Sequence, residues 1–167
     1  TINHAPLASN DSYTTAEDTQ LVISTPGVLE NDSDPEGDAL TTILVSDPVH
    51  GTISLSANGG FTYTPAANYN GPDSFTYRVN DGQLDSNNIA TVSFTVTAVN
   101  DAPVPKPMFL SDDEDFVGWY FDAFNGATDP DGDVLTLGNV VAPPFGSATP
   151  LYTGGRWLIL SKPLKDY

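Results

Sequence analysis

The chain contains two copies of one sequence pattern, and this repeat constrains the possible folds more than any other feature. Residues 34–41 (DPEGDALT) return as residues 129–136 (DPDGDVLT), at an offset of 95 residues. Closer to the amino terminus the offset is 97, since residues 3–6 (NHAP) return as residues 100–103 (NDAP). A period near 96 residues has the length of a whole domain and exceeds the roughly 20–50 residues of solenoid repeats. The repeat therefore predicts two domains of one kind, at residues 1–101 and 102–167.

The first hundred residues carry the pattern of an all-β domain. Apolar and polar residues alternate with period two, as in residues 92–96 (VSFTV), which is typical of strands with one buried face. The 14 Gly and 14 Pro recur every few residues and leave no room for long helices. Seven short strands of this kind predict a two-sheet immunoglobulin-like sandwich, with a closed barrel as the alternative. We expect the strands at residues 8–15, 20–30, 40–46, 51–56, 60–64, 74–80 and 90–99.

The second copy stops before its last two strands. Tyr167 follows shortly after the position that corresponds to the fifth strand, so the sixth and seventh strands have no counterpart. A sandwich without them would expose its core and an unpaired sheet edge. We therefore expect either a fragment of a longer chain or missing strands that another molecule supplies by strand addition.

The net charge excludes several classes of partner. Five Lys and Arg against 22 Asp and Glu give a formal charge of −17, which excludes unspecific binding of nucleic acid and disfavours anionic lipid. No apolar run is long enough to span a membrane, so we expect no direct membrane insertion. The absence of Cys excludes disulfides and thiolate metal sites. Disorder is excluded because hydrophobic residues make up 39% of the chain and its aromatic residues fall in patterned segments.

Most of the acidic residues fall at the predicted ends of the domains. We call the end at which the chain enters the first domain its entry end, and the opposite end its exit end. If the strands alternate in direction, the loop at residues 32–38 and the turn at Asp81 lie at the entry end. The turn at residues 17–18 and the loop before Asp73 lie at its exit end. That exit end would face the entry end of the second domain. The junction then gathers seven carboxylates: Glu17, Asp18, Asp73, Asp101, Asp129, Asp131 and Asp133.

Carboxylates gathered in this way predict a calcium site. Partly desolvated like charges about 4 Å apart repel each other by several kcal/mol, and five basic residues cannot neutralise them. Calcium takes six to eight oxygen ligands from carboxylates, carbonyls and Asn side chains, whereas magnesium keeps its waters and zinc prefers His and Cys. Asp-Pro and Asp-Gly are also ordinary turn residues, and salt-adapted proteins carry diffuse surface acid. Those alternatives do not explain why the acids concentrate at domain ends and recur at a fixed offset. At the entry end the candidate ligands are Asp32, Asp34, Glu36, Asp38 and Asp81.

The sequence resembles cadherin-like repeats of large bacterial surface proteins, including repeat-in-toxin adhesins. The resemblance rests on Glu17, the linker at residues 100–103 (NDAP), residues 129–131 (DPD) and the stretch from Tyr63 to Tyr77. It implies that Glu17, the Asn100-Asp101 linker and the Asp129-to-Asp131 segment bind Ca²⁺ between successive repeats. The sequence departs from the family in two places. The additional linker Asn is absent, and the acidic motif before the sixth strand is replaced by residues 68–73 (NYNGPD). His4 stands where the second copy has Asp101, so we expect a weaker site at the entry end.

The resemblance implies an extracellular, non-enzymatic module at a bacterial cell surface, which acts as a rigid spacer or adhesion repeat and contacts neighbouring repeats. A glycosidase-like carboxylate pair would need a cleft, which the pattern does not indicate, and His4 and His50 lack the partners of a catalytic triad. Two alternatives stay open. One is a carbohydrate-binding or self-associating module that uses an aromatic surface at residues 119–121 (WYF). The other is an accessory domain of a secreted hydrolase.

Overall fold

The structure is a computed structural model that describes residues 2–106, 119–122, 124–138, 146–153 and 156–163. The chain divides into two compact units, Thr1–Val99 (unit 1) and Asn100–Tyr167 (unit 2), and each is considered by itself. Among the described residues, the regular structure is strand throughout except for one short 3₁₀ helix, η1, at Gly27–Leu29. The all-β prediction is therefore confirmed.

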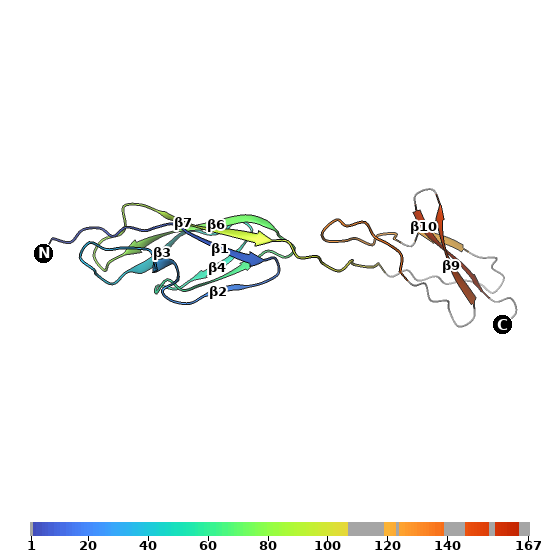
Figure 1. Cartoon of the computed structure of the whole chain (residues 1–167), viewed down its shortest axis with the longest axis horizontal. Coiled ribbons are helices and arrows are strands. Elements are labelled where there is room, and N and C mark those ends of the chain that lie inside the picture. The colour runs from blue at the N-terminus through green and yellow to red at the C-terminus, as the bar shows by residue number, and fades with distance from the viewer. Residues whose placement is uncertain (1, 107–118, 123, 139–145, 154–155, 164–167) are drawn as a thin grey trace. The chain divides into compact units, whose positions relative to one another are not determined.

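Unit 1 is a sandwich of two open sheets whose strands run along its length (Figure 1). One sheet has the order β1-β7-β6-β3 and the other the order β2-β5-β4. β1 and β7 pair in parallel, with Asp11 opposite Val92, and the other pairs are antiparallel. Two separate sheets exclude the closed barrel. The strands are β1 (Asp11–Ala16), β2 (Leu21–Ile23), β3 (Thr41–Ser46), β4 (Gly51–Leu55), β5 (Phe61–Pro65), β6 (Gly71–Asn80) and β7 (Ala90–Thr97).

The strand expected at residues 20–30 is much shorter than predicted. β2 ends at Ile23, because Pro26 has no N–H for a sheet and the chain then turns into η1. Gly27 adopts φ +54° at a place where its backbone passes close to Gly59; a Cβ atom there would lie 2.1 Å from the Gly59 carbonyl oxygen. The turn is fixed by the Val28 N–H, which donates to the same oxygen at 3.1 Å. A close approach of two backbones ends the strand here.

The core of unit 1 is built mainly from aromatic rings between the two sheets. Tyr63 of β5 stacks on Phe94 of β7 with ring centroids 3.9 Å apart, and Phe61 meets Phe75 edge-on at 5.7 Å. Tyr63, Phe75 and Tyr77 are fully buried. These rings come from strands whose alternation was predicted, because period-two alternation places every second side chain on the inner face.

Unit 2 contains one described sheet. Its strands are β8 (Trp119–Asp122), β9 (Gly146–Thr153) and β10 (Arg156–Pro163), in the order β8-β10-β9. This order matches that of β2, β5 and β4 in unit 1. The predicted aromatic surface at residues 119–121 falls in β8, but the placement of its side chains lies outside the described part of the structure. In the described ranges, no helix has the length and apolarity needed to cross a membrane.

Candidate functional site

The predicted acidic residues of unit 1 lie at its two ends. At the entry end, the Asn3 side-chain amide donates to Asp81 Oδ2 at 2.8 Å, which joins the N-terminal segment to the turn after β6. The same segment forms a bridge between Leu7 and Ser33, with N–H···O distances of 2.8 and 3.1 Å. The N-terminal segment therefore contacts both of the segments whose acids were predicted to lie at the entry end, the loop at residues 32–38 and the turn at Asp81.

The loop after η1 is organised by the carboxylate of Asp34. Asp34 Oδ1 accepts hydrogen bonds from the N–H groups of Glu36 and Asp38, at 2.9 and 3.0 Å. The Gly37 N–H donates to the Asp34 carbonyl at 3.2 Å, and Gly37 adopts φ +79°, which suits glycine. The loop is thus a tight turn wrapped around one carboxylate, as its sequence predicts.

Unit 2 repeats this turn with the same hydrogen bonds. Asp129 Oδ1 accepts from the N–H groups of Asp131 and Asp133, at 3.0 and 3.1 Å. The Gly132 N–H donates to the Asp129 carbonyl at 3.1 Å, with Gly132 at φ +77°. The repeated sequence therefore builds the same local geometry twice.

The N-terminal segments of the two units also make equivalent contacts with these turns. In unit 1 the His4 N–H donates to Glu36 Oε2 at 3.0 Å, and in unit 2 the Asp101 N–H donates to Asp131 Oδ2 at 2.7 Å. The side chains at these positions differ. His4 Nδ1 lies 2.6 Å from Glu36 Oε1, and this hydrogen bond holds the pKa of the Glu36 carboxyl below its ordinary value. The entry end of unit 1 thus places a basic side chain against the acid loop where unit 2 has another acid.

One carboxylate oxygen at the entry end has the character of a cation ligand. Asp34 Oδ2 is buried and has no hydrogen-bond partner among the described residues. A buried carboxylate oxygen normally has a partner, because leaving it unpaired costs free energy. Carboxylate oxygen is also the donor that calcium prefers. The chemistry of this loop therefore fits a hard cation. Within the described ranges, however, no three His, Asp or Glu side chains converge on one ion position.

Asp32 and Asp81 serve the fold of unit 1. Asp32 Oδ1 accepts the Ser9 N–H at 2.6 Å, and its two oxygens lie 3.2 and 3.1 Å from the Tyr77 hydroxyl. Asp81 Oδ1 accepts the N–H groups of Gln83 and Leu84, both at 2.7 Å. The pKa of Asp81 is lowered, mainly by the Leu84 N–H. Both residues hold loops in place, and their metal assignment stays a prediction.

Asp11 was not predicted as part of any site. Its Oδ2 lies 3.2 Å from the Tyr77 hydroxyl, which also contacts Asp32. Burial raises the pKa of Asp11 to about 6 and raises the pKa of Asp32, and the charge of Asp32 adds to the shift of Asp11. The sequence feature that could have pointed to Asp11 is its position, an acidic residue at the start of an otherwise alternating strand. That signal does not reveal which tyrosine the acid meets.

At the exit end, the side chain of Glu17 is almost fully buried and binds the segment that directly follows β7. Glu17 Oε1 accepts the Val99 N–H at 2.5 Å, and Oε2 accepts the side-chain amide of Asn70 at 3.3 Å. Asp18 Oδ1 accepts the N–H of Asn68 at 3.0 Å. The two predicted acids of the turn at residues 17–18 are therefore hydrogen-bonded to the loop before β6.

Asp73 is saturated by donors from unit 1 itself. Its Oδ1 accepts the N–H groups of Val49 and Ser74, at 3.0 and 2.9 Å. Its Oδ2 accepts the His50 N–H at 3.0 Å and the Tyr63 hydroxyl at 2.8 Å. The contacts assign Asp73 a structural role, and its predicted role as a metal ligand stays a prediction.

Asn100, the predicted linker ligand, makes a local contact in unit 2. Its side-chain amide donates to the Asp101 carbonyl at 3.0 Å.

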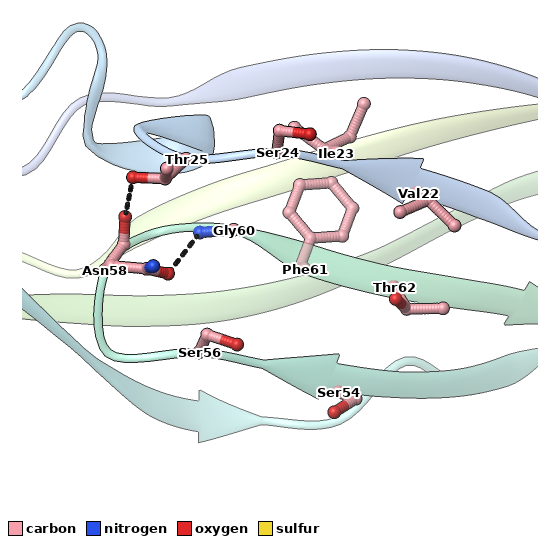
Figure 2. A pocket seen from close by; sticks show the side chains of 10 residues that line it. All are labelled: Val22, Ile23, Ser24, Thr25, Ser54, Ser56, Asn58, Gly60, Phe61 and Thr62. Carbon is pink, nitrogen blue, oxygen red and sulfur yellow. Dashed lines mark hydrogen bonds between the residues drawn. The ribbon is translucent and has the colours of Figure 1, made fainter.

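A shallow hollow on unit 1 carries none of the predicted ligands. It lies beside β2 and the β4–β5 turn, where Thr25 Oγ1 donates to the Asn58 carbonyl at 3.0 Å and the Gly60 N–H donates to Asn58 Oδ1 at 3.3 Å (Figure 2). Its other lining groups include the side chains of Ser24, Ser54 and Ser56 and the ring of Phe61. It contains no titratable pair that would suggest catalysis.

Comparison with known proteins identifies the family. The model of the bacterial cadherin-like domain matches residues 3–98, so the chain belongs to the bacterial cadherin-like domain family. Membership of this family supports a role as an adhesion or spacer module, and domains of this kind are typically extracellular. The Integrin beta-like protein E of Dictyostelium discoideum is 51% identical over 87 residues, which cover 44% of this chain and 4% of that protein.

Two solved structures show more distant similarity. A variant of the endo-fucoidan hydrolase MfFcnA4 from glycoside hydrolase family 107 is 25% identical, with a TM-score of 0.46 over 96% of this chain and 24% of that chain. Domains 4–9 of the surface layer protein SbsC are 12% identical, with a TM-score of 0.33 over 97% of this chain and 27% of that chain. The chain thus spans a small part of each relative.

Proposed function

We propose that the chain is a non-enzymatic, calcium-stabilised cadherin-like module that acts as a spacer or adhesion repeat of a bacterial extracellular protein. The observation that carries the calcium proposal is the repeated turn around Asp34 and Asp129. Each turn uses one oxygen of its central carboxylate internally, and in unit 1 the other oxygen is buried without a partner. Calcium would supply the missing positive charge for that oxygen.

The charge balance of unit 1 supports the same proposal. Arg78 is the only Lys or Arg among residues 1–99, against 12 Asp and Glu. An unneutralised excess of this size destabilises a compact unit by self-repulsion. Candidate ligands in unit 1 are Asp34, Glu36 and Asp38 with Asp81. In unit 2 they are Asp101, Asp129, Asp131 and Asp133. At the exit end, Glu17 remains a candidate from the resemblance, and Asp18 remains one from the predicted gathering of acids at the junction.

Thermal unfolding of the full chain with and without calcium tests this proposal. For one site at about 100 times its dissociation constant, calcium should stabilise the folded state by about 2.7 kcal/mol relative to EDTA. Asp129→Asn and Asp34→Asn should each reduce that gain. Asp47→Asn removes the same charge from an exposed position outside both turns and should leave the gain unchanged. An equal gain in all four proteins would show that the effect is unspecific.

A further inference from the structure

Unit 2 contains an Asn-Gly pair in an exposed turn that the proposed calcium sites do not use. The sequence has three such pairs, Asn58-Gly59, Asn70-Gly71 and Asn125-Gly126. An Asn-Gly pair is chemically reactive, because glycine has no side chain to shield its backbone nitrogen from the amide of the preceding residue. The structure places the three pairs in different surroundings, and these surroundings determine which pair reacts.

The reaction is deamidation, in which the glycine nitrogen attacks the side-chain Cγ of the asparagine. The glycine nitrogen loses its proton and forms a bond to Cγ, and the amide nitrogen takes up a proton and leaves as ammonia. Water then opens the cyclic imide at either carbonyl and leaves aspartate or isoaspartate, so no oxidant, metal or enzyme is required. The reaction is favoured where the glycine N–H and the asparagine side chain are free of hydrogen bonds and the backbone between them can rotate.

The pair Asn58-Gly59 is held on both sides of the reacting bond. The Gly59 N–H donates to the Ser56 carbonyl at 2.9 Å, and Gly59 is buried. Asn58 Oδ1 accepts the Gly60 N–H at 3.3 Å, and the Asn58 carbonyl accepts the Thr25 hydroxyl at 3.0 Å (Figure 2). Both reacting groups would have to break hydrogen bonds before they could meet, so this pair is protected.

The pair Asn70-Gly71 is held by the sheet and by a side chain. Gly71 is the first residue of β6 and pairs with Val96 of β7. The side-chain amide of Asn70 donates to Glu17 Oε2 at 3.3 Å. Ring closure would have to rotate the backbone at the edge of this strand pair and break the contact with Glu17, so this pair is also protected.

The pair Asn125-Gly126 has neither kind of restraint. Both residues are exposed and form the centre of a turn that the Ala127 N–H closes by donating to the Phe124 carbonyl at 2.9 Å. Gly126 adopts φ +77° as the third residue of the turn, a position whose N–H takes no part in closing it. Among the described residues, neither the Gly126 N–H nor the Asn125 side chain has a hydrogen-bond partner.

Lys106 places a positive charge beside this turn. A Cβ built on Gly126 would lie 3.2 Å from Nζ of Lys106, so the ammonium group is close to the backbone of Gly126. A nearby cation favours the negatively charged form of a group. Ring closure begins when the glycine nitrogen loses its proton, and hydrolysis ends with a new carboxylate. Lys106 therefore favours both the first step and the product.

We propose that Asn125-Gly126 is a site of spontaneous deamidation in the folded chain, while the other two Asn-Gly pairs persist. In the isoaspartate product the main chain runs through the side-chain methylene of residue 125, which lengthens the turn. The hydrogen bond that closes the turn then loses its geometry. Thr128, which bridges to Val104, follows directly, so deamidation loosens this part of unit 2.

Peptide mapping of the full chain by mass spectrometry tests this proposal. The chain is incubated at physiological temperature in water enriched in oxygen-18, at pH 6.5 and at pH 8.5, and sampled over several weeks. Each deamidation raises the peptide mass and brings one labelled oxygen from the solvent. We expect the peptide with Asn125 to react at least about tenfold faster than those with Asn58 and Asn70. The reaction should be faster at pH 8.5, because the glycine nitrogen must lose its proton.

Two variants and the unfolded chain serve as controls. Asn125→Gln should remove most of the ammonia released by the folded chain, whereas Asn58→Gln should leave the release unchanged. In urea the three pairs should react at similar rates, because the hydrogen bonds and strand pairing that protect two of them are lost. The proposal is overturned if Asn125 persists, or if Asn58 or Asn70 reacts as fast as Asn125 in the folded chain. It is also overturned if the order of rates stays the same in urea, since the sequence alone would then set it.

Discussion

The hydroxyl of Tyr77 lies 3.1 Å from Oδ2 of Asp32, at the entry end of unit 1. Asp11 Oδ2 lies 3.2 Å from the same hydroxyl, so two carboxylates share one proton donor. A single hydroxyl proton cannot satisfy both. Buried like charges of this kind favour the protonated form of one carboxyl. This relationship has consequences for stability that can be measured.

The first prediction concerns pH. The folded-state pKa of Asp11 is raised to about 6 from 3.8, mainly by burial, so the folded state binds more protons than the unfolded state between these values. The contribution of Asp11 is therefore fully present below pH 3.8 and is lost as the pH rises through about 6. Asp11 is only partly buried, so after discounting for solvent screening we expect about 1 kcal/mol.

The variant Asp11→Asn isolates this contribution. Glu36 and Asp81 have lowered pKa values and contribute stability that is lost at low pH, so they oppose the trend of Asp11 in the wild-type chain. The difference in unfolding free energy between Asp11→Asn and wild type, measured in EDTA from pH 4 to pH 7, should shift in favour of the variant as the pH rises. Asp47→Asn should show no such trend. A flat difference for Asp11→Asn contradicts the prediction.

The second prediction concerns the Tyr77 hydroxyl itself. Tyr77→Phe keeps the ring but leaves the Ser9 and Val28 carbonyls without this donor. We expect a loss of about 1–3 kcal/mol in the unfolding free energy, which is the usual effect of unpaired buried polar groups. Chemical denaturation measures it. Tyr13→Phe, on an inner position of β1, should change stability much less, and equal losses would show that the hydroxyl network is unimportant.

The third prediction separates the structural role of Asp73 from metal binding. Asp73→Ala leaves four donors unpaired, including the Tyr63 hydroxyl and the His50 N–H. The variant should lose about 2–4 kcal/mol, since several groups become unsatisfied at once. The loss should be the same in EDTA and in calcium. A loss that appears only in calcium would instead support the metal assignment made from the sequence.

The fourth prediction compares two glycines with positive φ. In Gly27→Ala the new Cβ would meet the Gly59 carbonyl at 2.1 Å, so strain adds to steric overlap and we expect a loss of about 2–4 kcal/mol. In Gly37→Ala nothing lies within 4 Å of the new Cβ, so only the left-handed backbone costs free energy, about 1–2 kcal/mol. Urea denaturation of both variants measures the difference. Equal losses would contradict the close backbone contact.

The strands could be predicted because alternation reports directly on burial. Residues 92–96 place Val92, Phe94 and Val96 inward, and all three are buried in β7. The turn around Asp34 could also be predicted, because its hydrogen bonds are local and its sequence recurs in unit 2. The short β2 was missed although Pro26 signals its end in the sequence. The second cause, the contact between the backbones of Gly27 and Gly59, joins segments distant in sequence and could not be predicted.

The roles of individual acids were harder to predict for the same reason. The sequence locates Asp32, Asp73 and Glu17 near the ends of unit 1, and the structure confirms that position. Their partners are Tyr77, Tyr63 and Val99, each on another strand or segment. A carboxylate that stabilises a loop and one that binds an ion can occupy the same turn. Only the hydrogen bonds of each oxygen distinguish them.

Calorimetric titration of calcium into the metal-stripped full chain tests the central claim most directly. Extracellular calcium modules bind at roughly 10⁻⁴ to 10⁻³ M, so the titration must reach several millimolar. We predict saturable heat in wild type, reduced uptake in Asp129→Asn, and unchanged uptake in Asp47→Asn. Absence of any uptake by the wild-type chain at these concentrations, or uptake unaffected by both Asp34→Asn and Asp129→Asn, would contradict the account.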